Sequence, residues 1–362
     1  MTRLVLHVLP LDLARGAQRY ARELRRRLDS AEVQHRILTI FASDSRELAA
    51  DVALGIPRPL ALRFGFDPRA AWALGHELRR LRPQVVVAHG GEPLKYLAAV
   101  SRSSPPVVYY KIGVAHAAAL GRRGRLVQRL LMRRATVVAG VSQECLDEAS
   151  QAFGVPQGKL VLVPNGRDDA QFFPQQPTEP PGEPHLIFVG HLTTSKRPAR
   201  FIEVVRRLRE RGVSFSASIV GDGPLRGELA RPAAAADVVL VGHSDRVAEL
   251  LRAADVAAFT SVPGGEGMPG VFIEVGLSGL PMVSTAVPGA STVIGDGQTG
   301  FVVGVDDLDA FVDKTARLLT DAQLRRRFGA AARERCLSGF TLDESVGKWR
   351  TLLGDLLVGV AS

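Results

Sequence analysis

The central strand-to-helix turn of this chain reads Ser261-Val262-Pro263-Gly264-Gly265-Glu266-Gly267-Met268-Pro269-Gly270-Val271-Phe272-Ile273-Glu274. The apolar run before it, residues 255–259, predicts a buried strand, and the run from Val271 onward predicts a helix. The first amides of a helix have no partner inside it and carry partial positive charge. The turn therefore predicts an anion site at the edge of an α/β sheet.

Two glutamates, with seven residues between them, flank this turn. Glu274 lies one turn into the expected helix, where its carboxylate can accept hydrogen bonds from a ribose diol. Glu266 precedes the turn, within reach of the hydroxyls of a sugar attached to the phosphate. Taken singly, Glu266 also fits a solvated loop residue, and Glu274 a charge that favours the helix dipole. The phosphate is expected over the backbone of Gly267, Met268, Gly270 and Val271.

Composition indicates a globular protein with room for two domains. The 362 residues are 46% hydrophobic and 23% charged. Cys145 and Cys336 form neither a disulfide framework nor a metal-ligand spacing, which favours a reducing cytoplasm. No apolar run approaches the ~20 residues that span a bilayer, and the N-terminus enters a strand directly, so we expect no signal peptide.

Positive charge is concentrated in the first half of the chain. Residues 1–174 hold 26 Lys and Arg against 15 Asp and Glu, whereas residues 175–362 hold 20 against 22. A basic field raises the local concentration of anionic partners. We therefore expect the first half to meet an anionic acceptor or an anionic surface.

The first half alternates apolar runs with helical patterns, which predicts a parallel α/β domain with ligands at the strand C-termini. The segment after the first strand lacks the Gly-x-Gly-x-x-Gly spacing, which argues against an NAD enzyme. His89 follows the run Val85-Val86-Val87-Ala88, where it is a candidate cleft residue, on the acceptor side in the family resemblance described below. A strand-end histidine satisfied by backbone groups is an equally good interpretation.

The opening turn also resembles a known family motif. Ser261, Glu266-Gly267, Glu274 and Gly279-Leu280-Pro281 fall in register with the Glu-x7-Glu signature of retaining nucleotide-sugar glycosyltransferases of the GT-B fold. The resemblance implies two Rossmann-like α/β domains that face each other across a cleft. It divides the chain into an acceptor domain at 1–174, a proline-rich linker at 175–184, a nucleotide-sugar domain at 185–337 and a helix at 338–362 that returns to the first domain.

The resemblance assigns donor contacts outside the turn. His185 to Pro198 is similar to the family segment whose Arg and Lys neutralise the departing diphosphate. Lys196 matches the lysine, His191 stands where the arginine is usual, and Arg197 stands where a glycine is usual. A solvated lysine at a helix start is the other interpretation of Lys196. Further donor contacts are implied for Gly16, at a helix start, and Gly223, in a Gly-Asp-Gly-Pro loop.

The acceptor side departs from the family pattern. A family strand that often ends in a histidine here ends in Lys111-Ile112, so His116 is the nearest candidate catalytic histidine, with Lys111 as an alternative cation. The segment Val163 to Asp168 resembles the family's Pro-Asn-Gly-Val-Asp segment. Asp168-Asp169 lacks the geometry of a metal cage, and we expect no metal.

Residues 121–134 hold six arginines and no acidic residue, with Leu126, Val127, Leu130 and Leu131 at helical spacing. Such a helix can lie on an anionic membrane or bind a phosphorylated lipid acceptor. An ordinary peripheral helix with its apolar face on the sheet is the other interpretation.

The predicted function is retaining transfer of a hexose from a nucleotide diphosphate sugar to a lipid, glycan or small-molecule acceptor. The alternatives are a nucleotide-sugar-binding protein without transferase activity and a nucleotide-sugar epimerase. We expect no nucleic-acid partner, and a cytoplasmic protein that can be peripheral on the inner face of the membrane.

Overall fold

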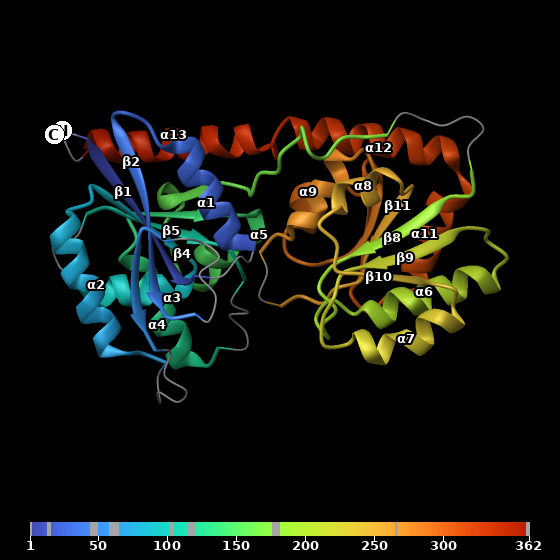
Figure 1. Ribbon diagram of the computed structural model, residues 1–362, viewed down its shortest axis with the longest axis horizontal. Helices are drawn as coiled ribbons and strands as arrows, with labels where there is room; N and C mark the ends of the chain where they lie inside the picture. The colour runs from blue at the N-terminus through green and yellow to red at the C-terminus, as the bar shows by residue number, and fades with distance from the viewer. Residues whose placement is uncertain are drawn as a thin grey trace. The chain divides into compact units, whose positions relative to one another are not determined.

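The computed structural model describes residues 2–12, 16–43, 50–57, 65–100, 105–114, 120–175, 182–264 and 267–359. The chain separates into two compact units, each with its own parallel sheet (Figure 1). Unit 1 comprises residues 1–165 and 345–362, and unit 2 comprises residues 166–344.

Unit 2 thus begins before the proline-rich segment at which we expected the boundary. The reason is a pair of backbone hydrogen bonds inside unit 2. Arg167 N donates to Phe340 O (3.1 Å), and Leu342 N donates to Arg167 O (2.8 Å). Phe172, a few residues further on, is buried as well.

Unit 1 is built on seven described strands, all parallel, in the order β3-β2-β1-β4-β5-β6-β7. Strands β4 and β5 are buried along their whole length, which explains why only their last residues, His89 and Lys111, carry basic side chains in otherwise apolar or aromatic runs. The strands are β1 (Arg3–Leu11), β2 (Val33–Phe41), β3 (Val52–Ile56), β4 (Val85–His89), β5 (Val107–Lys111), β6 (Val137–Gly140) and β7 (Leu160–Leu162).

Helices connect the strands of unit 1, and most of one further helix from the C-terminus of the chain belongs to the same unit. The C-terminal helix α13 (Leu342–Gly359) belongs to unit 1 from Ser345 onward. Its Trp349 is fully buried and donates through Nε1 to Tyr20 Oη (3.1 Å). The other helices are α1 (Gly16–Leu28), α2 (Pro68–Leu81), α3 (Gly91–Val100), α4 (Arg122–Arg133) and α5 (Gln143–Asp147), the last followed by a π-helical turn (Glu148–Ala152).

Unit 2 has six described strands, all parallel, in the order β10-β9-β8-β11-β12-β13. They are β8 (His185–Val189), β9 (Ser216–Val220), β10 (Val239–Gly242), β11 (Val256–Phe259), β12 (Met282–Thr285) and β13 (Gly300–Val303). Its helices are α6 (Pro198–Glu210), α7 (Arg226–Ala235), α8 (Val247–Arg252), α9 (Gly270–Leu277), α10 (Ala290–Val293), α11 (Leu308–Thr320) and α12 (Ala322–Leu337).

Helix α6 shows how a helix of unit 2 is fixed to the sheet. Phe201, Val204, Val205 and Leu208 recur at helical spacing and are all fully buried. Burial of each such side chain stabilises the fold by about 1.5–3 kcal/mol. The opposite face is charged and meets α11.

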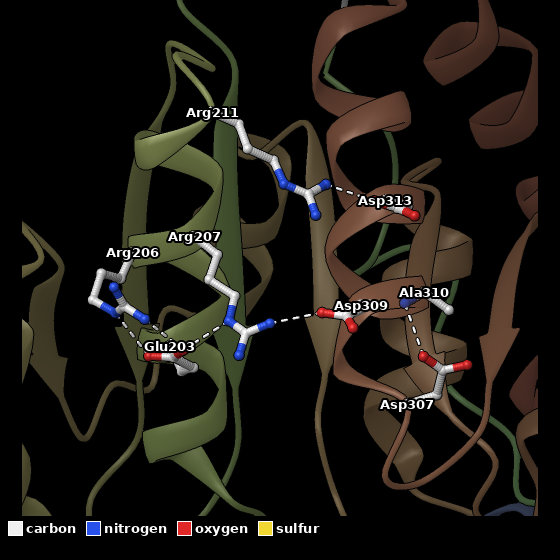
Figure 2. Close-up of polar contacts among 8 residues, drawn as sticks. All are labelled: Glu203, Arg206, Arg207, Arg211, Asp307, Asp309, Ala310 and Asp313. Carbon is white, nitrogen blue, oxygen red and sulfur yellow. Dashed lines mark hydrogen bonds and ion pairs between the residues drawn. The ribbon is translucent and has the colours of Figure 1, made fainter.

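An ion-pair cluster joins α6 to α11 (Figure 2). Glu203 accepts from Arg206 (2.7 Å) and Arg207 (2.8 Å), and hydrogen bonds from these two residues lower its pKa to about 2. Arg207 also reaches Asp309 of α11 (2.7 Å). Glu203 therefore holds the guanidinium that bridges the two helices.

We expect Glu203→Ala to lower the free energy of unfolding by about 0.5–1 kcal/mol at low ionic strength, because it removes two partly exposed ion pairs. Urea unfolding at low salt and in 1 M NaCl checks this, since salt screens such pairs and should shrink the difference. Glu334→Ala on α12 is the control, because no ion pair within the described residues uses Glu334. An equal effect of the two substitutions would contradict the assignment.

The structure corrects one interpretation of the basic helix. The apolar side chains of α4 do not all pack on the sheet, since Leu126, Val127 and Leu130 are 58%, 54% and 51% exposed. Met132 is the buried side chain of this helix, and Leu131 is half-buried. An ordinary peripheral helix would place its leucines inward, so that interpretation is wrong for α4.

Candidate active site

A pocket of unit 2 lies where the order of its strands reverses. Strands β9 and β10 are added on one side of β8, and the chain then crosses over to add β11, β12 and β13 on the other side of β8. Crevices at such switch points, beyond the strand C-termini, are where open α/β sheets bind ligands. The pocket is lined by Ser195, Lys196, Phe259, Ser261, Val262, Gly264, Pro269, Val287 and Pro288.

Lys196 is held at this pocket by the loop after β8. Its Nζ lies 4.7 Å from the centroid of the Phe259 ring, a cation–π distance. Thr260 Oγ1 donates to the carbonyl oxygens of Lys196 (3.2 Å) and Arg197 (2.9 Å). The loop is therefore fixed to the end of β11, and the ammonium group is fixed with it.

Ser261 contributes a buried hydroxyl to the same pocket. The residue is 4% exposed, and its Oγ has no hydrogen-bond partner within the described residues. A buried polar atom without a hydrogen-bond partner destabilises the folded state by about 1–3 kcal/mol. A polar ligand in the pocket would remove that cost.

The start of α9 adds backbone donors. Pro269 precedes the helix without a side-chain cap, and no hydrogen bond within the described residues uses the N–H groups of Met268, Gly270 or Val271. Gly267 and Met268 are buried, and Gly270 and Val271 are half-buried. The sequence predicted these residues as a phosphate site. Met268 and Gly270 flank Pro269, which lines the pocket.

Glu274 has a partner that the sequence analysis did not foresee. Arg167 Nε donates to Glu274 Oε1 over 2.7 Å. The same guanidinium covers the start of α9, because a Cβ added at Gly270 would overlap it. A cation at a helix N-terminus is unfavourable by itself, and the Glu274 carboxylate offsets it. The only sequence signal was an arginine in the Pro-Asn-Gly-Arg-Asp segment, where the family has an apolar residue.

The remaining donor-side residues lie on two loops of unit 2, after β8 and after β9, and on one helix of unit 1. His191 is exposed after β8. Arg197 precedes α6 with φ 48°, a left-handed conformation that explains the family's glycine there, and it pairs with Asp306 (3.0 Å). Gly223 packs so closely that a Cβ would lie 2.6 Å from Leu192 O. Gly16 is the first residue of α1.

Lys111, in unit 1, is 1% exposed and forms a buried ion pair with Glu148 (2.6 Å). Its Nζ also donates to Gly113 O (2.6 Å). The Glu148 carboxylate thus neutralises, inside the unit, the charge that the sequence suggested for an acceptor. His116 and Glu266, both predicted as catalytic, lie outside the described residues.

His89 belongs to a chain of three buried histidines in unit 1. His7 Nδ1 lies 2.9 Å from His89 Nε2, and His7 Nε2 lies 3.0 Å from His35 Nδ1. Burial lowers the pKa of His89 to about 3 and that of His35 to about 4. Burial, and then the neighbouring histidines, also hold the pKa of His7 well below its usual value. All three rings are therefore neutral at pH 7.

Unit 2 thus has a lysine at its switch-point pocket and unpartnered helix-start amides next to Pro269 at the edge of that pocket, an arrangement that suits an anionic ligand such as a phosphate. Within the described residues, no group of three or more His, Cys, Asp or Glu side chains is placed to hold a metal ion. No described helix combines the length and hydropathy that a membrane span requires.

Two family models match the chain in succession. The model described as Glycosyltransferase Family 4 matches residues 14–171, and the model described as Glycosyl transferases group 1 matches residues 183–321. Together they account for more than half of the sequence. The chain belongs to this family of glycosyltransferases.

A curated relative and two solved structures agree with this assignment. The N-acetyl-alpha-D-glucosaminyl L-malate synthase of Bacillus anthracis is 28% identical over 240 residues, which are 63% of this chain and 62% of the relative. The matches span 55–62% of the length of the first three curated relatives.

A glycosyltransferase from Rickettsia africae has a TM-score of 0.81 at 15% identity and covers 98% of this chain and 99% of its own. Anabaena Alr3699/HepE, solved with UDP and glucose, has a TM-score of 0.78 at 16% identity, covering 98% and 100%. These similarities show the GT-B fold for this chain.

Proposed function

We propose that this protein transfers a hexose from a nucleotide diphosphate sugar to an acceptor hydroxyl, with retention of the anomeric configuration. One observation carries the proposal. The Lys196 ammonium and the unpartnered Ser261 hydroxyl line one switch-point pocket, and the α9 amides begin at its edge. Hydrogen-bond donors and positive charge in this arrangement suit a diphosphate. The neighbour solved with UDP and glucose supports a nucleotide-sugar donor.

These groups would act on the bond that breaks. As the C1–O bond to the diphosphate lengthens, negative charge grows on the leaving phosphate, and Lys196 together with the α9 amides stabilises it. The acceptor oxygen forms its bond to C1 on the face from which the diphosphate departs, and the acceptor's proton passes to the departing phosphate oxygen. In this mechanism, Glu266 contacts the transferred sugar and Glu274 the ribose.

The test is a transfer assay with UDP-, GDP- and ADP-hexoses, read as nucleotide diphosphate released and as the anomeric configuration of the product by NMR. We expect one donor base to be preferred, and that donor should raise the unfolding temperature. Donor binding without release or transfer would favour the binding protein, and a change of sugar configuration without acceptor would favour an epimerase. An inverted product would overturn retention.

We propose that no metal ion takes part, because Lys196 and the backbone amides supply the positive charge that a divalent cation otherwise provides. We expect EDTA at 5 mM to leave kcat within about twofold, and added Mg²⁺ or Mn²⁺ to have the same small effect. A loss of tenfold or more that Mg²⁺ or Mn²⁺ restores would contradict this proposal.

Glu274→Ala should weaken donor binding by about 10- to 100-fold, the cost of one charged hydrogen bond to a ribose hydroxyl. Isothermal titration with the preferred donor measures it. Arg167→Ala should weaken donor binding too. The double variant should lose less binding free energy than the two single variants lose together, because the two side chains act as a pair. Donor affinity that is unchanged in Glu274→Ala would remove Glu274 from the site.

We also propose that the protein is cytoplasmic and peripheral on the inner face of the membrane. Cys145 and Cys336 are both buried free thiols, as suits a reducing compartment. Fractionation of cells that produce the protein, with and without a high-salt wash, tests this location.

A further inference from the structure

Helix α4 presents aliphatic side chains to solvent. Leu126, Val127 and Leu130 are each more than half exposed, although the side chains of other helices in unit 1, such as Leu74 and Leu94, are buried. Leu126 and Leu130 are four residues apart, and Val127 is three residues before Leu130, so the three adjoin on one face. Exposed aliphatic clusters of this kind mark interaction sites.

Arginines surround this cluster. The helix and the residue after it carry six of them and no acidic residue, and all six are exposed. No ion pair within the described part of the chain uses any of the six. The arginines are Arg122, Arg123, Arg125, Arg129, Arg133 and Arg134.

Inward-facing side chains fix the orientation of the helix. Met132 is buried in the core of unit 1, and Leu131 packs against the same core. The helix lies beside α3 (Figure 1). Because these contacts hold α4 from one side, Leu126 and Leu130 cannot turn inward without loss of the Met132 contact. The exposed face is therefore a property of the folded unit.

We propose that the exposed face of α4, defined by Leu126, Val127, Leu130 and the six arginines, docks on an anionic phospholipid surface. The aliphatic side chains enter the level of the acyl chains, and the guanidinium groups bind lipid phosphates around them. Arginine suits this position because its stem can lie along apolar surface while its head remains at the phosphates.

Other partners fit this face less well. A nucleic acid would satisfy the arginines but leave three aliphatic side chains in water. A second copy of the same face would bring twelve guanidinium groups together across a two-fold axis, because each copy supplies six. Unlike these two partners, an anionic bilayer offers apolar depth and negative charge together.

Vesicle sedimentation of the full-length protein tests the proposal without a donor, so its outcome is independent of transferase activity. We expect binding to vesicles of 30% phosphatidylglycerol in phosphatidylcholine and none to pure phosphatidylcholine. Leu126→Ser/Leu130→Ser should weaken binding at least tenfold. Arg122→Gln/Arg129→Gln/Arg133→Gln should weaken it about 100-fold, at about fivefold for each arginine.

Matched controls lie in unit 2. Val239→Ser replaces another aliphatic residue that is 61% exposed, and Arg231→Gln replaces another exposed arginine of a helix. Both should bind like the wild type. Leu126→Trp, in a Trp72→Phe background, should show an emission blue shift with anionic vesicles only. Equal binding by the leucine variant and the wild type, no blue shift, or no binding to anionic vesicles would each overturn the proposal.

Discussion

Lys196→Ala should lower kcat by about 100- to 1,000-fold, with a much smaller change in KM. The expectation follows from the position of Nζ in the pocket, where it would meet charge that grows only as the leaving phosphate departs. Loss of one fixed donor to such charge typically has an effect of this size. Steady-state kinetics with the preferred donor and a saturating acceptor measure it.

Lys314→Ala provides a closely matched control. Lys314 Nζ lies 4.8 Å from the centroid of the Phe301 ring, almost the same contact that Lys196 makes with Phe259 at 4.7 Å. Lys314 is on α11 and does not line the pocket. We expect near wild-type kcat for Lys314→Ala. If the two variants lost the same activity, Lys196 would be a structural residue and its proposed role would fail.

Mild acid should unfold unit 1 through its histidine chain. His7, His35 and His89 are neutral in the folded unit because burial lowers their pKa values, whereas an unfolded histidine takes up a proton near pH 6.5. Below that pH the unfolded chain binds more protons than the folded one, so stability falls as pH falls. Each histidine should remove about 1.4 kcal/mol per pH unit between about 6.5 and its folded pKa.

The fluorescence of Trp349 can follow this transition. Trp349 is fully buried and stacks on His89, with 6.5 Å between ring centroids. The other tryptophan of the chain, Trp72, is 71% exposed. In a Trp72→Phe background, the urea midpoint should fall steeply between pH 7.5 and pH 5. His35→Asn should flatten this dependence by removing one titrating group, and His191→Asn, at an exposed position of unit 2, should not. A midpoint independent of pH would contradict the role of the chain.

Local sequence rules predicted most of the architecture. Unbroken apolar runs predicted buried parallel strands, as in Val85 to Ala88, and their alternation with helical patterns predicted the α/β domain of the first half. The family resemblance implied the second α/β domain. Departures occurred where local rules are weak. The edge strand β3 is only partly buried, which left its apolar pattern faint, and helix α5 passes into a π-helical turn at Glu148 that no local pattern indicated.

The site of unit 2 was predictable to a similar degree. Gly264 of the glycine-rich turn and Lys196 line the pocket, and α9 begins at Gly270, one residue before the start predicted at Val271. Sequence can indicate such positions because strand C-termini and helix starts are local features. Arg167 was missed, since nothing near it in sequence indicates that it meets Glu274, 107 residues away.

By itself, the sequence determined the fold class and the turn that forms the candidate donor site. Only the tertiary structure decided which partner each charged side chain meets. In the folded chain, Arg167 forms an ion pair with Glu274, and Lys111 forms one with Glu148. Leu126 and Leu130 are exposed to solvent. The physical reason is that periodicity and turn chemistry act over a few residues, whereas ion pairs and exposed faces depend on how distant segments pack.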